Sequence, residues 1–218
     1  MPAPRAAGAV FFDVDGTLVP GTSSSAHLAA SLGHLGGLVA AEEAYARGEV
    51  DNRRVAELDA RGWRGASEGE VAGLLRTLPL VAGIAETVAW CRGQGLVPVL
   101  ATLAWTPVGA YLAERFGFRA YDGPRPARAG GRYTGRVARH FDEHDKRDAA
   151  LARAAALGLA PTACAAIGDS RSDLPLFAAA GLSIAFNGSA HARAAADHAV
   201  EGADLRAVLP VLEVWRGR

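Results

Sequence analysis

Short, continuous apolar runs recur along the chain, and segments with helical spacing separate them. Because such runs are typical of strands buried on both faces, we expect strands at Ala9–Phe12, Leu96–Ala101, Thr162–Ile167 and Leu182–Phe186. The intervening patterns predict helices at Ile84–Arg92, Val108–Phe116, Asp148–Leu157 and Leu174–Ala180. This alternation predicts an α/β fold with a doubly wound, parallel (Rossmann-like) sheet, whose ligands bind at the carboxyl ends of the strands.

The segment from Ser24 to about Leu78 has a different sequence pattern. Its apolar residues have helical spacing, it contains many charges, and it has no convincing strand. We interpret it as a small helical insertion that ends near Pro79. The predicted organisation is therefore a core domain of residues 1–20 and 80–218 and a helical domain of residues 21–79. Within residues 122–137 we expect a hairpin whose turn is Gly130-Gly131.

Composition narrows the class of protein. Half of the 218 residues are hydrophobic and 21% are charged, which allows a sizeable core. Lys plus Arg and Asp plus Glu both number 23, and this balance argues against a nucleic-acid binder. The two cysteines, Cys91 and Cys164, fit neither a disulfide scaffold nor a zinc module, so we expect a cytoplasmic protein. We expect no signal peptide and no membrane span.

Two acidic clusters follow predicted strands. They read Asp13-Val14-Asp15-Gly16-Thr17-Leu18 and Gly168-Asp169-Ser170-Arg171-Ser172-Asp173. Parallel strands end at one edge of a sheet, so four carboxylates would meet there and repel one another without a cation. Carboxylate oxygens are hard ligands, and they favour Mg²⁺. A single such Asp is more often a turn former or helix cap, but the repeated pair favours a metal site over that alternative.

Lys146 is the one lysine among 23 basic residues, so the chain uses arginine almost everywhere else. A compact ammonium at this position indicates a site that grips phosphate as a point charge. The alternative is an accident of composition in an exposed charged segment. Thr102, which follows the predicted strand Leu96–Ala101, offers a hydroxyl and a backbone N–H to a phosphate oxygen, although many such residues only satisfy local backbone.

In this order, these motifs resemble those of the haloacid dehalogenase superfamily of phosphohydrolases, and in detail its phosphoserine phosphatase-like branch. The resemblance covers about Ala9 to Leu209, with the two Asp clusters as its first and fourth motifs, Thr102 as the second and Lys146 as the third. The helical insertion corresponds to the C1-type cap domain of that branch. The resemblance implies a Mg²⁺-dependent phosphatase that hydrolyses a small-molecule phosphate ester.

The resemblance also implies a role for each motif residue. Asp13 would attack phosphorus and form an aspartyl phosphate, and Asp15 would serve as general acid and then general base. The metal would be held by the Asp13 carboxylate, the Asp15 backbone carbonyl and Asp169, with Asp173 as a ligand or as a partner of the ligands. Lys146 and Thr102 would bind the phosphate oxygens.

Several positions depart from the family pattern and bear on the substrate. In the phosphoserine enzymes the cap supplies a Glu and an Arg that hold serine, and an ungapped comparison places Thr22 or Ser23 and Glu57 there. Glu57 would repel a substrate carboxylate, unless Arg53, Arg54 or Arg61 compensates. After Thr102 the usual pair of glycines is replaced by Leu103-Ala104, and Trp105 follows. Ser172 replaces the usual Asn. We therefore expect a substrate other than phosphoserine, either cationic or sugar-like.

The same residues bear on three alternative functions. A phosphotransferase such as a mutase would use the same Asp13 and metal but shield the intermediate from water. A binding protein without catalysis is hard to reconcile with the joint presence of Asp13, Asp15, Lys146 and Asp169. A nucleotide-binding Rossmann protein needs Gly-x-Gly-x-x-Gly after its first strand, and this chain has Asp-x-Asp-Gly-Thr there.

Overall fold

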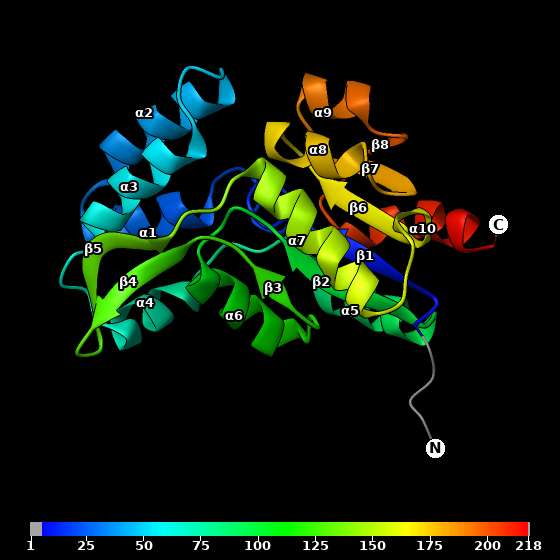
Figure 1. Ribbon diagram of the computed structural model, residues 1–218, viewed down its shortest axis with the longest axis horizontal. Coiled ribbons are helices and arrows are strands. Elements are labelled where there is room, and N and C mark those ends of the chain that lie inside the picture. Colours follow the sequence, from blue (N-terminus) through cyan, green and yellow to red (C-terminus); the bar gives the residue numbers. More distant parts are fainter. Residues whose placement is uncertain (1–5, 218) are drawn as a thin grey trace.

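A six-stranded parallel sheet forms the centre of the computed structural model, which describes residues 6–217 (Figure 1). The spatial order is β3-β2-β1-β6-β7-β8. The bounds are β1 Gly8–Phe12, β2 Leu96–Ala101, β3 Tyr121–Asp122, β6 Cys164–Gly168, β7 Leu182–Phe186 and β8 His198–Val200. Chain order runs outward from β1 in one direction and from β6 in the other, so the predicted doubly wound fold is confirmed.

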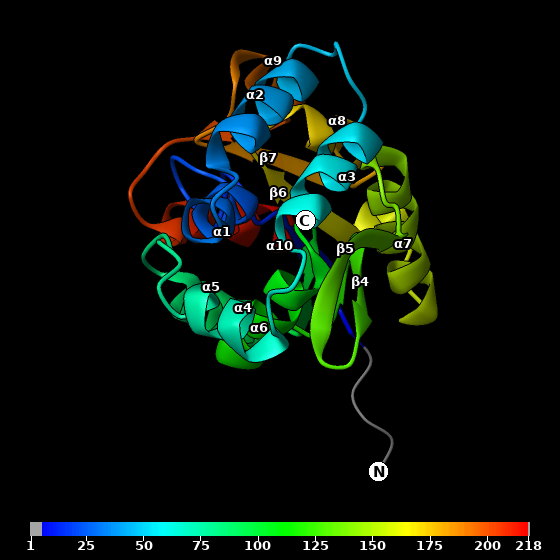
Figure 2. The ribbon, with the colours of Figure 1, turned by 90° about the vertical axis from the view of Figure 1, so that its left-hand side faces the viewer.

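Helices cover both faces of the sheet because its central strands are apolar on both sides. In β1, Val10 and Phe12 belong to one core cluster, whereas Ala9 and Phe11 belong to the other. Figure 2 shows α5 and α6 on one side of the sheet and α7 on the opposite side. The first core is closed by α5 (Ile84–Gly93), α6 (Thr106–Phe116) and α10 (Leu209–Arg216), and the second by α7 (Glu143–Ala156), α8 (Leu174–Phe177) and α9 (Ala190–Ala195).

Four helices between β1 and α5 lie beyond one end of the sheet, and the last of them, α4, also packs beside α6 (Figure 1). They are α1 (Ser24–Leu32), α2 (Leu35–Ala46), α3 (Asn52–Gly62) and α4 (Glu68–Leu75). Side-chain oxygens of Ser23, Asp51 and Ser67 accept backbone N–H groups at the starts of α1, α3 and α4. We call these four helices the cap; its exact limits at residues 21 and 79 stay a prediction.

The hairpin, predicted from the Gly130-Gly131 turn, consists of β4 (Arg125–Ala129) and β5 (Arg132–Arg139). Although its sequence lies in the core segment, it packs on the cap. Tyr133 of β5 contacts Trp63 edge to face, with 5.0 Å between ring centroids. The Gly65 N–H also donates to the Tyr133 carbonyl at 2.9 Å. The hairpin therefore links the cap to the sheet.

The largest departure from the expected elements lies in α7, which begins at Glu143 rather than Asp148. Asp142 and Asp145 form a reciprocal capping box that starts the helix earlier. This earlier start places Lys146 in the first turn of α7, with its side chain buried. The described residues also contain three short 3₁₀ helices: η1 (Pro161–Ala163), η2 (Arg171–Asp173) and η3 (Leu205–Val208). Within residues 6–217, no helix combines the length and apolarity that a membrane crossing requires.

Candidate active site

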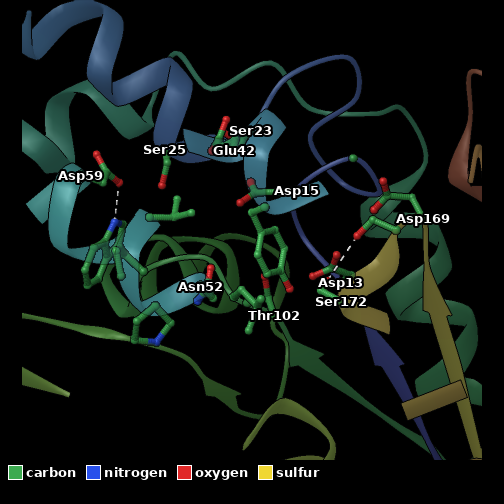
Figure 3. A pocket seen from close by; sticks show the side chains of 18 of the residues that line it. Asp13, Asp15, Ser23, Ser25, Glu42, Asn52, Asp59, Thr102, Asp169 and Ser172 are labelled. Carbon is green, nitrogen blue, oxygen red and sulfur yellow. Dashed lines mark hydrogen bonds between the residues drawn. The ribbon is translucent and has the colours of Figure 1, made fainter. Parts of the chain in front are cut away.

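The two acidic clusters meet at the point where the strand order reverses. Phe12 of β1 pairs with Ile167 of β6, and the Asp13 N–H donates to the Ile167 carbonyl at 2.9 Å. Asp13 and Asp169 therefore follow neighbouring strands and face one another (Figure 3). Asp13, Asp169 and Asp173 each offer a carboxylate oxygen within 4.8 Å of the others. This is the juxtaposition that the sequence predicts.

Lys146 supplies a positive charge against this cluster. Its Nζ lies 3.1 Å from Asp13 Oδ1 and 2.6 Å from Asp173 Oδ1, and its side chain is completely buried. Burial alone would lower the pKa of Lys146, but the carboxylates of Asp13 and Asp173 outweigh that effect and raise it. The ammonium therefore keeps its charge although it is removed from solvent.

Both carboxylate oxygens of Asp173 accept hydrogen bonds from groups of the protein. Oδ1 accepts from Lys146, while Oδ2 accepts the N–H groups of Asp169 and Ser170, both at 3.0 Å. The approach is so close that a Cβ added to Gly168 would lie 2.1 Å from the Asp173 carboxyl carbon. We therefore propose that Asp173 fixes Lys146 and the Asp169 loop, and is a partner of the metal ligands rather than a ligand.

The electrostatics of Asp13 and Asp169 favour a bound cation. Burial, and to a lesser extent the neighbouring carboxylates, raise the pKa of Asp13 to about 7 and the pKa of Asp169 to about 8, although Lys146 opposes both shifts. A hard divalent cation would neutralise this excess negative charge and find only oxygen donors. The donor set therefore fits Mg²⁺.

Asp15 lies in the same loop, partly buried, and turns toward the cap. Its Oδ1 accepts the backbone N–H of Ser24 at 2.6 Å, at the first residue of α1. Burial raises the pKa of Asp15, and the hydrogen bond from Ser24 only partly offsets this rise. A carboxyl group with a raised pKa keeps its proton to a higher pH than a free carboxyl group does, which suits general acid catalysis.

Thr102 and Ser172 bring hydroxyl groups to the same site. Thr102 follows β2, and its Oγ1 accepts the Ala104 N–H at 3.0 Å, so that its own O–H remains available as a donor. Ser172 lies with its Oγ 3.4 Å from Lys146 Nζ. Both side chains are buried, and both line the cavity that contains Asp13.

This cavity has a volume of about 370 Å³ and extends from the carboxylate cluster into the cap. Figure 3 shows Asp13, Asp169 and Ser172 at one end, Asp59 at the other, and Asp15 and Thr102 between them. Val55, Ala56, Leu103, Trp105 and Pro124 provide apolar wall, and the polar remainder is Gly16, Thr22, Ser23, Ser25, Glu42, Tyr45, Asn52 and Ser170.

The sequence comparison with the phosphoserine enzymes singled out Glu57, but Glu57 does not line the cavity. Its Oε1 accepts from Arg53 Nε at 3.2 Å, and its side chain is 35% exposed. Arg53, Arg54 and Arg61 do not line the cavity either. Of the residues predicted to shape the substrate pocket, the structure therefore places Leu103, Trp105 and Ser172 there and leaves Glu57 outside.

Two acidic residues of the cavity, Glu42 and Asp59, were missed from the sequence. Asp59 is 1% exposed and lies on the same helix face as Val55, Ala56 and Ala60. Glu42 follows buried Leu38 by one helical turn. A charged residue at an apolar position of a helical pattern is the signal that could have identified both.

The fold and the site together define a class of α/β proteins, with a doubly wound parallel sheet, a carboxylate pair after the first strand and a further acidic loop after a neighbouring strand. The family model for "haloacid dehalogenase-like hydrolase" matches residues 10–178. The chain belongs to the haloacid dehalogenase-like hydrolases, in their phosphoserine phosphatase-like branch, and is accordingly a phosphoric monoester hydrolase.

Two curated relatives are both named phosphoserine phosphatase. The protein from Halobacterium salinarum is 30% identical over 197 residues, covering 89% of this chain and 93% of the relative. The protein from Albidiferax ferrireducens is 29% identical over 216 residues, with 94% and 89% covered. A solved phospho-aspartyl intermediate analogue of phosphoserine phosphatase has a TM-score of 0.85 at 21% identity, over 94% of this chain and 98% of that chain. This structural similarity confirms the fold.

Proposed function

We propose that this protein is a Mg²⁺-dependent phosphatase that hydrolyses a small organic phosphate monoester through an aspartyl-phosphate intermediate. The observation that carries the proposal is the position of Asp13. Its carboxylate lies 3.1 Å from the buried ammonium of Lys146 and beside Asp169, at the inner end of a cavity large enough for a small ester. A carboxylate nucleophile needs such a counter-charge to approach a phosphate dianion.

In the first step, an Asp13 oxygen attacks phosphorus and the bond to the ester oxygen breaks. Asp15, whose pKa burial raises, gives its proton to the departing alkoxide. In the second step, Asp15 takes a proton from a water molecule, and the resulting hydroxide attacks phosphorus and releases Asp13. The products are the alcohol and inorganic phosphate, and Asp13 and Asp15 return to their initial states.

The remaining residues neutralise charge on the phosphoryl group. Lys146 is held by Asp13 and Asp173, so its ammonium is already oriented toward the site. The Thr102 hydroxyl is free to donate to a phosphoryl oxygen. Mg²⁺ would be held by the Asp13 carboxylate, the Asp15 backbone carbonyl and Asp169, and it would supply positive charge to the phosphoryl oxygens.

Cys91 and Cys164 are free and buried, which supports a reducing location such as the cytoplasm.

The proposal is tested by phosphate release from a panel of monoesters with and without Mg²⁺. Asp13→Asn should lower turnover by roughly three orders of magnitude or more, as expected for loss of a nucleophile. Acid-quenched wild-type protein should carry one phosphoryl group, and the variant should carry none. The matched control is Asp148→Asn, an exposed carboxylate of α7 that should leave turnover unchanged.

Three outcomes contradict the proposal. One is full activity of the Asp13→Asn variant. A second is turnover only when an acceptor alcohol is added, with the phosphoryl group transferred to that alcohol and no inorganic phosphate released, which would favour the phosphotransferase alternative. Undiminished turnover after chelation of divalent cations would remove the metal from the mechanism.

A further inference from the structure

The cap end of the cavity carries two carboxylates, those of Glu42 and Asp59. Glu42 of α2 lines the cavity and is held by Ser23, whose Oγ donates to Glu42 Oε1 at 2.6 Å. Among residues 6–217, no Lys or Arg forms an ion pair with Glu42. Burial raises the pKa of Glu42 to about 7, and the carboxylates of Asp15 and Asp59 add to the rise.

The other carboxylate at this end, Asp59, is already satisfied. Its Oδ2 accepts from Trp105 Nε1 at 2.6 Å, and its Oδ1 accepts from Trp63 Nε1 at 3.1 Å. His34 Nε2 lies 2.6 Å from the same Oδ1. These partners fix the Asp59 carboxylate as part of the wall. Glu42, with a single side-chain donor, is the carboxylate that remains able to bind a ligand.

No described residue that lines the cavity is a Lys, Arg or His. Arg171 contacts Tyr45, which lines the cavity, but its guanidinium nitrogens are engaged with other groups. Its Nη1 donates to the Tyr45 carbonyl at 2.8 Å, and its Nη2 pairs with Glu143 at 3.2 Å. Lys146 is committed to Asp13 and Asp173. A carboxylate on the leaving group would therefore meet Glu42 without a cation to hold it.

We propose that the leaving group of the substrate is a small alcohol that carries a protonated amine and no carboxylate, and that Glu42 binds the amine. This proposal rests on the proposed phosphatase function. An ammonium next to Glu42 would supply the missing positive charge, while the carbon chain between amine and ester oxygen would contact Val55, Ala56, Leu103 and Trp105. The substrate class would then differ from that named for the curated relatives.

The test compares kcat/KM for three esters: O-phosphoethanolamine, O-phospho-L-serine and sn-glycerol 3-phosphate. Phosphoethanolamine should exceed phosphoserine by at least about tenfold, because like charges repel in a desolvated pocket. Glu42→Gln should lower the ratio of phosphoethanolamine to glycerol phosphate by about tenfold, the effect of one charge-assisted hydrogen bond. Glu42→Asp should retain part of the preference. The control Glu43→Gln changes an exposed neighbour in α2 outside the cavity, and should leave the ratio unaltered.

A highest kcat/KM for phosphoserine or glycerol phosphate overturns the proposal, as does a Glu42→Gln variant with an unchanged ratio. If Glu42→Gln does not fold, calorimetric binding to the Asp13→Asn variant decides instead, and phosphoserine binding as tightly as phosphoethanolamine overturns it. The proposed function fails separately, through absence of phosphate release from all three esters or through full activity of Asp13→Asn. Release from all three esters that depends on Asp13, with phosphoserine preferred, refutes only the substrate class.

Discussion

Asp59 is a single residue through which the cap and the core share a hydrogen-bond network. It belongs to α3 of the cap, and its partner Trp105 follows β2 in the core. Its other indole partner, Trp63, is also fully buried and stacks edge to face on Tyr133 of the hairpin. Because buried indole N–H groups are costly without an acceptor, this carboxylate stabilises both tryptophans.

Replacing Asp59 with Leu tests that role. The change leaves two buried indole N–H groups without an acceptor, so the free energy of unfolding should fall by about 2–4 kcal/mol. Glu57→Leu is the matched control, because Glu57 is in the same helix but its side chain is 35% exposed; we expect a change within about 0.5 kcal/mol. Denaturant unfolding monitored by circular dichroism measures both values. Equal losses in the two variants would contradict the network.

Glu57 and Asp59 also show how far the sequence could predict the pocket. The sequence predicts Asp13, Asp15 and Asp169 because they follow apolar strands. It predicts Lys146 because this is the one lysine among 23 basic residues. Two helical residues separated by two positions point about 200° apart, so a small uncertainty in register exchanges the inward and outward side chains. Which face of α3 meets the cavity depends on tertiary packing. The sequence alone could therefore not decide whether Glu57 or Asp59 points into the cavity.

At the scale of elements, η2 and α2 are joined by Arg171. This residue lies between Asp169 and Asp173, and its guanidinium stacks over the Tyr45 ring, with 4.7 Å from its Cζ to the ring centroid. Glu143 of α7 pairs with Arg171 and also accepts from the Tyr45 hydroxyl at 3.3 Å. The loop proposed to hold the metal is thereby tied to the cap helix that carries Glu42.

We expect Arg171→Ala to loosen the cap without removing a reacting group. KM should rise by up to about fivefold, the factor that corresponds to an exposed ion pair of about 1 kcal/mol, with a smaller change in kcat. Hydrogen–deuterium exchange should accelerate in α2. Arg47→Ala removes an exposed pair with Glu49 at the end of the same helix, and neither readout should change. Unaltered exchange in α2 of the Arg171 variant would show that this contact does not anchor the cap.

Elements with strong local signals were predicted well, and elements defined by tertiary contacts were not. β1, β2, β6 and β7 are apolar runs that end at a turn or an Asp. β3 has 2 residues and β8 has 3, so neither contains enough sequence to show a pattern. They become strands only because the neighbouring strand offers backbone partners. The packing of the hairpin on α3 depends in the same way on Trp63 and Tyr133 meeting across the fold.

At the scale of the whole molecule, a formal net charge of zero conceals a strong local imbalance. Five carboxylates line one cavity, namely Asp13, Asp15, Glu42, Asp59 and Asp169. The pKa is raised for Asp13, Asp15, Glu42 and Asp169, in each case chiefly by burial. The folded, metal-free protein should therefore bind more protons than the unfolded chain over a range in which free carboxylates are ionised.

This proton excess fixes the sign of the pH dependence of stability. Unfolded Asp and Glu lose their protons near pH 4, whereas in the folded protein Asp13 and Glu42 keep theirs to about pH 7 and Asp169 to about pH 8. Without metal, the free energy of unfolding should fall as pH rises from about 4 to about 8, by up to about 1.4 kcal/mol per pH unit for each such group. Denaturant unfolding in a chelator, repeated across this range, measures the slope.

Both Mg²⁺ and the removal of one carboxylate should make the fall of stability with pH shallower. Mg²⁺ competes with protons for the same oxygens, so it should stabilise the protein strongly at pH 8 and weakly at pH 5. Asp169→Asn removes one titrating group, and should make the metal-free slope shallower and abolish most of the stabilisation by Mg²⁺. Asp148→Asn, at an exposed position, should preserve both effects. If metal-free stability rose between pH 5 and pH 8, the folded protein would bind fewer protons than the unfolded chain, and the raised pKa values of these carboxylates would be contradicted.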